Sequence, residues 1–227
     1  TNNLKKNSNL ELDDGAKIAV LGGGPAGSFF SIFALKLAKQ IGKDIDLTIY
    51  ESKDFSHDGP SSCNMCAGVI SESLVQMLAI EGICLKPPIV QRAIDTYCFQ
   101  TTGGDVFLNS PSKQKGIATV YRGGGPVNQT ASEAGTGHEF EKKSFDDFLL
   151  DCAEKEGAKV ENTRIEDIKL ENGRPIIFSK KGRMPDADLV VGACGINAKI
   201  INSFEKLGTG YSPPSTIKAY QSEIHIG

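Results

Sequence analysis

The strongest constraint on the fold is a glycine-rich turn between an apolar strand and an apolar helix. Residues 17–21 (KIAVL) predict a buried strand, and Gly22, Gly24 and Gly27 follow it in the spacing G-x-G-x-x-G. Pro25 suits the first helical turn, where a missing N–H costs nothing. A helix that starts there offers free N–H groups and a partial positive charge to an anion. The pattern therefore predicts a βαβ unit that binds a pyrophosphate.

An acidic residue ends the next expected strand. Residues 45–50 (IDLTIY) alternate in polarity, and Glu51 follows them directly. A carboxylate at this point can accept hydrogen bonds from both ribose hydroxyls of an adenosine, and it repels a 2′-phosphate. The site is thus expected to take FAD or NAD rather than NADP.

The rest of the chain predicts further α/β elements and an antiparallel insertion. Asn172-Gly173 is a strong hairpin signal inside a three-stranded meander over 165–186. A simple NAD domain does not need this meander, so the presence of the meander favours a flavin fold. The predicted class is a Rossmann-like FAD-binding domain with a parallel sheet, crossover helices and a β-meander. Further helices are expected at 25–40, 71–80 and 144–156, and further strands at 159–162, at 188–192 and over 90–121, where Gly103-Gly104 marks a turn.

Composition excludes two classes of partner. The net charge of −3 gives no basic footprint for nucleic acid. No apolar run reaches the ~20 residues of a membrane-spanning helix. The six cysteines are scattered, which favours reduced thiols and a cytoplasmic setting.

Four motifs stand out along the chain: KIAVLGGGPAGS at 17–28, CAGVIS at 66–71, SFDDFLLDCAEKEGAKV at 144–160 and DLVVGACGIN at 188–197. Together with Glu51 they resemble the geranylgeranyl reductase family, within the wider class of flavoproteins that includes p-hydroxybenzoate hydroxylase. The resemblance covers roughly residues 16–200.

The resemblance implies a set of cofactor-binding residues. In the family, a Cys-Ala/Gly-x-Gly loop lies beside the flavin, an Arg contacts the cofactor, and a backbone position meets the adenine. The implied residues, together with those of the glycine turn, are Gly22, Gly24, Pro25, Ala26, Gly27, Glu51, Cys66, Ala67, Arg122, Ile165 and Gly195.

Three points stay open within this set. Cys63 competes with Cys66 for the family position, and Lys142 competes with Arg122. The C-x-x-C spacing of the two cysteines fits either a dithiol that exchanges electrons with the flavin or a loop that merely contains two thiols. Cys194 stands where the family has an acid that takes part in pyridine-nucleotide handling, so the chain departs from the family at this position.

The function implied is FAD-dependent reduction of carbon–carbon double bonds in an isoprenoid-like substrate. The alternatives are an FAD-dependent aromatic monooxygenase and a non-catalytic electron-transfer subunit. The expected partners are a small-molecule or lipid-like substrate and an unidentified electron donor. The expected division is a flexible tail at 1–15, an FAD-binding domain at 16–205 and the start of a truncated substrate domain at 206–227. This piece alone is expected to be inactive.

Overall fold

The chain divides into two compact units in the computed structural model, and the first contains the glycine turn. Unit 1 comprises Thr1–Ser52 and Leu150–Ser215, and unit 2 comprises Lys53–Leu149 and Thr216–Gly227. The structure describes residues 11–55, 68–86, 89–94, 96–109, 117–120, 131–132, 139–140, 143–196 and 198–217.

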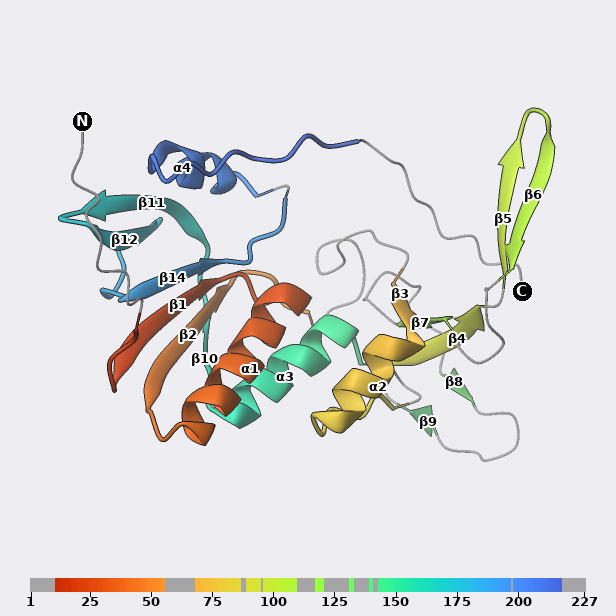
Figure 1. The fold of residues 1–227 in the computed structure, drawn as a ribbon, viewed down its shortest axis with the longest axis horizontal. Coiled ribbons are helices and arrows are strands. Elements are labelled where there is room, and N and C mark those ends of the chain that lie inside the picture. Colours follow the sequence, from red (N-terminus) through yellow and green to blue (C-terminus); the bar gives the residue numbers. More distant parts are fainter. Residues whose placement is uncertain are drawn as a thin grey trace. The chain divides into compact units, whose positions relative to one another are not determined.

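A four-stranded parallel sheet forms the centre of unit 1 (Figure 1). Its strand order is β10-β2-β1-β14, and every neighbouring pair is parallel. The strands are β10 (Lys159–Asn162), β2 (Ile45–Glu51), β1 (Ala16–Leu21) and β14 (Leu189–Gly192). Parallel strands have their carboxyl ends at one edge, so the segments that follow all four strands meet there.

One face of this sheet is covered by α1 (Pro25–Gln40). Val20, Ile49 and Ile32 are fully buried there, and an added Cβ on Gly27 of the helix would lie 3.2 Å from Val20. The later part of α3 (Phe145–Glu156) lies beside α1, where the Lys36 amine is 4.0 Å from the Glu156 carboxylate.

The opposite face packs against the meander and α4 (Ile201–Lys206). The meander consists of β11 (Ile165–Glu171), β12 (Arg174–Ser179) and β13 (Gly182–Arg183). Asn172 and Gly173 both have positive φ at the first turn, as a two-residue I′ hairpin requires. The shared core consists of Ala19, Leu21, Tyr50, Ile165, Ile168, Ile177, Ala187 and Ile200.

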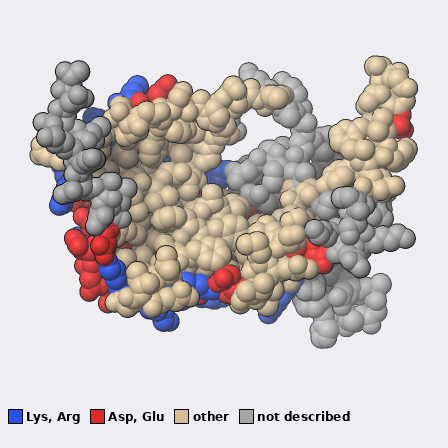
Figure 2. Space-filling view, in the orientation of Figure 1, with Lys and Arg blue, Asp and Glu red and all other residues tan. Residues whose placement is uncertain are grey.

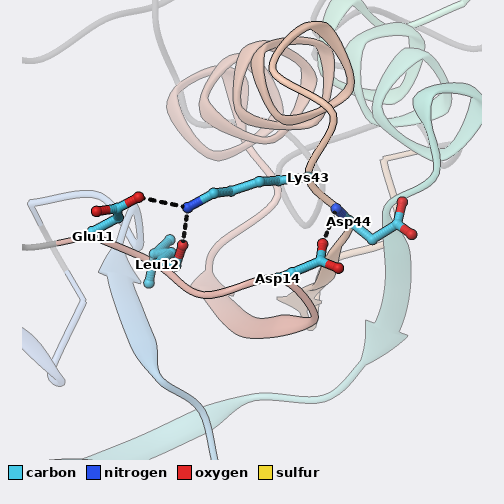
Figure 3. Close-up of polar contacts among 5 residues, drawn as sticks. All are labelled: Glu11, Leu12, Asp14, Lys43 and Asp44. Atoms are coloured by element: carbon cyan, nitrogen blue, oxygen red, sulfur yellow. Dashed lines mark hydrogen bonds and ion pairs between the residues drawn. The ribbon is translucent and has the colours of Figure 1, made fainter.

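The segment before β1 is fastened to the turn between α1 and β2 (Figure 3). The Lys43 amine pairs with Glu11 at 3.0 Å and donates to the Leu12 carbonyl at 2.7 Å. The Asp44 N–H donates to the Asp14 carboxylate at 2.7 Å. The part of the expected tail that the structure describes, from Glu11 onward, is therefore held in place.

Unit 2 contains one three-stranded antiparallel sheet, one helix and two hairpins among its described residues. The sheet has the order β3-β7-β4, and Ser71 caps the helix by accepting from the Leu74 N–H. The elements are β3 (Val69–Ser71), α2 (Glu72–Ile80), β4 (Val90–Ile94), β5 (Thr96–Thr101), β6 (Gly104–Asn109), β7 (Ile117–Val120), β8 (Ala131–Ser132) and β9 (Glu139–Phe140).

The β5–β6 hairpin exposes an apolar face. Tyr97 lies opposite Leu108 and Phe99 lies opposite Val106, so these four side chains point to one face of the ribbon. All four are exposed. In Figure 2 the hairpin is almost free of charge.

The predicted fold class is confirmed: a parallel sheet, helices on its face and an antiparallel meander. The boundaries at 16–205 and 206–227 remain a prediction. Among the described residues, no helix combines the length and apolar character needed to cross a bilayer.

Candidate cofactor site

The first glycine of the turn sits where a side chain cannot. Gly22 has φ +111°, a conformation that residues with a Cβ rarely adopt. A Cβ there would lie 2.5 Å from the carbonyl oxygen of Ala193, in the segment after β14. The Gly22 N–H donates to the Tyr50 carbonyl at 2.9 Å, so the turn is tied to β2 as well.

The third glycine allows the helix to start close to the turn. A Cβ on Gly27 would collide with the carbonyl oxygen of Gly22. Ser28 is the first helical residue whose N–H bonds back along the chain, to the Gly24 carbonyl at 2.9 Å. The N–H groups of Ala26 and Gly27 therefore have no acceptor within the helix. Pro25 has no backbone N–H, so no donor is left unpaired at that position.

Glu51 reaches the turn directly. Its Oε2 accepts a hydrogen bond from the Gly23 N–H at 2.8 Å. A Cβ on Gly23 would lie 3.0 Å from the Glu51 Cβ and 3.1 Å from Leu150, so any side chain here would press on both neighbours. The G-x-G-x-x-G motif assigns Gly23 no role, although three successive glycines stand where the motif needs two.

Ser28 is the second residue that the sequence analysis missed. It is fully buried, and its hydroxyl donates to the Gly23 carbonyl at 2.9 Å. The Gly23 residue is thus held at its N–H by Glu51 and at its carbonyl by Ser28. The G-x-G-x-x-G pattern specifies neither contact.

The predicted adenine position lies beside Glu51. Glu51 pairs with Asn162 at the end of β10, and Ile165 begins β11 three residues later. Ile165 is 7% exposed and packs in the same core as Tyr50 and Leu21. Along the strand order β10-β2-β1, Ile165 thus lies three residues beyond the end of β10, Glu51 ends β2, and the glycine turn follows β1.

The segment after β14 completes the edge. The Ala193 N–H donates to the Leu21 carbonyl at 2.9 Å, which holds this segment against the glycine turn. Burial raises the pKa of the neighbouring Cys194 thiol, so it stays protonated at neutral pH. Gly195 has φ +73°, with open space where its Cβ would be.

This edge fits the ADP half of a dinucleotide. Gly22 and Gly27 let the turn pack against the segment after β14 and against the start of α1 more closely than any Cβ would allow. The first-turn N–H groups suit a pyrophosphate, and the Glu51 carboxylate suits a ribose. Among the described residues, no cluster of three or more His, Cys, Asp or Glu side chains could hold a metal ion.

Cys66, Ala67 and Arg122 lie outside the described residues, as do the competing Cys63 and Lys142. The residues that flank this group in unit 2, Gly68 and Val120, are joined by a 2.7 Å hydrogen bond from the Val120 N–H. The roles proposed for individual residues of the site therefore all remain predictions.

The fold and this edge define a class of protein, the Rossmann-type flavoenzymes. The family model described as tryptophan halogenase matches residues 101–217, which is just over half of the chain. This chain belongs to the tryptophan halogenase family. No curated protein matches it significantly.

Solved structures agree on the fold. Halogenase PltM in complex with phloroglucinol and FAD is 15% identical, with a TM-score of 0.54 over 84% of this chain and 36% of that one. The p-nitrophenol 4-monooxygenase PnpA from Pseudomonas putida DLL-E4 is 14% identical, with a TM-score of 0.51 over 85% of this chain and 44% of that one. The chain thus spans less than half the length of either protein.

These findings sharpen the expectations from sequence. The family is FAD-dependent, so the predictions of an FAD-dependent oxidoreductase and of FAD as the cofactor are confirmed at the level of the family. The resemblance to geranylgeranyl reductases is supported only in this coarser sense, because family and structures alike are halogenases and monooxygenases.

Proposed function

We propose that this chain supplies the FAD-binding part of an enzyme that oxidises an aromatic small molecule, by halogenation or hydroxylation. The observation that carries the proposal is the family match over residues 101–217, together with a strand edge that fits the ADP half of FAD. Neither a metal nor a nucleic acid enters the proposal.

The residues of unit 1 would bind and orient the cofactor. The N–H groups of Gly24, Ala26 and Gly27 would receive the pyrophosphate, Glu51 the ribose hydroxyls, and the backbone at Ile165 the adenine. Cys66, Ala67, Arg122 and Gly195 would lie nearer the flavin. FAD, when bound and reduced, supplies electrons to dioxygen in oxidations of this type. The electron donor that reduces it remains unidentified.

An aromatic substrate is supported by the two relatives with similar folds. One was solved with phloroglucinol and the other is a p-nitrophenol monooxygenase, and both compounds are phenols. A phenol ring is electron-rich, which suits attack by an electrophilic oxygen or halogen. A phenolic ring is therefore the proposed substrate class.

Reduction of an isoprenoid double bond is the second candidate. It rests on the CAGVIS motif at 66–71, which resembles the flavin-side loop of geranylgeranyl reductases. The two candidates differ in their need for dioxygen, because the reductase passes its electrons to the substrate itself. A cytoplasmic location is likewise a proposal and rests on thiols: among the described cysteines, Cys84, Cys98, Cys152 and Cys194, none forms a disulfide bond.

The test is a product assay on the protein that carries this chain, loaded with FAD and reduced without air. Phloroglucinol and p-nitrophenol are added with ¹⁸O-labelled dioxygen, with and without bromide. The proposal expects either bromine or ¹⁸O in the ring. Turnover of geranylgeranyl chains under anaerobic conditions, with phenols unchanged, would replace it with the reductase.

A further inference from the structure

We propose that Ser28 is a positioning residue for the pyrophosphate, acting through the Gly23–Gly24 peptide. The inference rests on the proposed FAD site and assigns a role that the glycine motif does not include. Ser28 is fully buried, so it cannot touch a ligand in the solvent-open turn. Its influence must pass through the group that it contacts, the Gly23 carbonyl at 2.9 Å.

The geometry of a trans peptide carries the argument. The Gly23 carbonyl and the Gly24 N–H belong to one planar unit and point in opposite directions. Because Ser28 holds the carbonyl toward the buried side of α1, the Gly24 N–H must point to the other side, out of the helix start. This is the side on which a helix N-terminus receives an anion.

Such a hold is needed here because the turn has little rigidity of its own. Gly22, Gly23 and Gly24 carry no Cβ, so their peptide planes can flip at low cost. Glu51 fixes the plane before Gly23 by accepting its N–H, and Ser28 fixes the plane after it. The hydroxyl also polarises the peptide whose carbonyl it contacts, which makes the Gly24 N–H a stronger donor.

Ser31 offers a matched control. It is buried to the same extent on the same helix, and its hydroxyl donates to the Gly27 carbonyl at 2.8 Å. That contact is an ordinary bond to the carbonyl four residues back. Ser28 instead reaches five residues back, past the helix start and into the turn.

The experiment compares ligands that contain or lack the pyrophosphate. FAD, ADP and adenosine are titrated against the protein that carries this chain and against its variants by calorimetry. Ser28→Ala is expected to weaken ADP and FAD by roughly three- to tenfold, the factor of one hydrogen bond, with adenosine unchanged. Ser28→Cys, which keeps the volume and a weak donor, should fall between. Ser31→Ala should change none of the three.

A second measurement does not depend on ligand. The amide resonance of Gly24 in the free protein should shift in Ser28→Ala and stay in place in Ser31→Ala. Equal weakening of adenosine and ADP, or no weakening at all, would overturn the role of Ser28. A different result would refute the proposed cofactor site itself: the unmodified protein binds neither ADP nor FAD, although the Gly24 resonance shifts in Ser28→Ala. The bond from Ser28 to the Gly23 carbonyl would then be a structural contact alone, and the inference would be overturned with the site.

Discussion

At the scale of single residues, Glu51 does two things at once. One carboxylate oxygen accepts the Gly23 N–H, and the side chain is the proposed acceptor for the ribose. A carboxylate accepts through both oxygens, whereas an amide has one acceptor and one donor end. In the proposed site, ribose recognition and the shape of the turn would be coupled through one charged group.

The substitution Glu51→Gln keeps the size of the side chain but removes its charge and one of its two acceptor oxygens. The amide can satisfy either the Gly23 N–H or the ribose, and a hydrogen bond to a charged group is worth roughly 1.5–3 kcal/mol. We expect the affinity for FAD to fall at least tenfold in Glu51→Gln, and to fall further in Glu51→Ala. Flavin fluorescence on titration measures both, and unchanged affinity in Glu51→Gln would count against the ribose role.

Tyr50 is expected to make the stability of unit 1 depend on pH in the alkaline range. Burial raises the pKa of its phenol above the usual value of about 10, and the negative charges of Glu161 and Asp46 add to this. The unfolded chain loses the proton first, so stability is complete below pH 10 and declines as pH rises through the folded pKa. Tyr50→Phe should be less sensitive to this rise, as urea unfolding at pH 8 and pH 10.5 would measure. Parallel losses in both proteins would rule Tyr50 out.

The sequence predicted the positions of the candidate site that follow a motif, and it missed two residues whose contacts shape the glycine turn. Gly22, Gly27 and Glu51 follow from strand, turn and helix spacing, because those distances are local. Gly23 and Ser28 matter through contacts with a side chain 28 residues away and with a carbonyl before the helix. Only the folded backbone brings such partners together.

At the scale of elements, α4 depends on a glycine in β14. An added Cβ on Gly192 would lie 2.9 Å from the end of the Phe204 ring. Gly192→Ala should therefore cost about 1–3 kcal/mol of unfolding free energy through overpacking. Phe204→Leu removes the end of the ring, so the double variant should recover part of that loss. Urea midpoints of the two single variants and the double variant test this, and strictly additive losses would show that the ring does not set the constraint.

Local elements were more predictable than their pairing. Helix α1, the Asn172-Gly173 turn and strand β14 were all expected from periodicity and turn chemistry. The strand order β10-β2-β1-β14 was not predicted, because it depends on which distant strands find each other rather than on any segment alone.

At the scale of the whole molecule, unit 1 is built from two separate stretches of chain. Residues 53–149 leave it after β2 and return within α3. Both junctions lie at the same point, because Glu51 and Leu150 both approach Gly23 within 3.1 Å of where its Cβ would be. A long excursion can leave and rejoin a domain at such a point without disturbing its core.

Because the sheet joins distant parts of the chain, it can be completed only late in synthesis. Lys17, at the start of β1, bonds to Asp188, a partner 171 residues later in the chain. At a translation rate of about 5–20 residues per second, β1 waits roughly ten to thirty seconds for β14 to be made. During that interval the apolar edge of β1 has no neighbour on one side, which invites chaperone binding and aggregation. The glycine turn is translated early, yet it takes its final shape only once Ala193 has emerged from the ribosome.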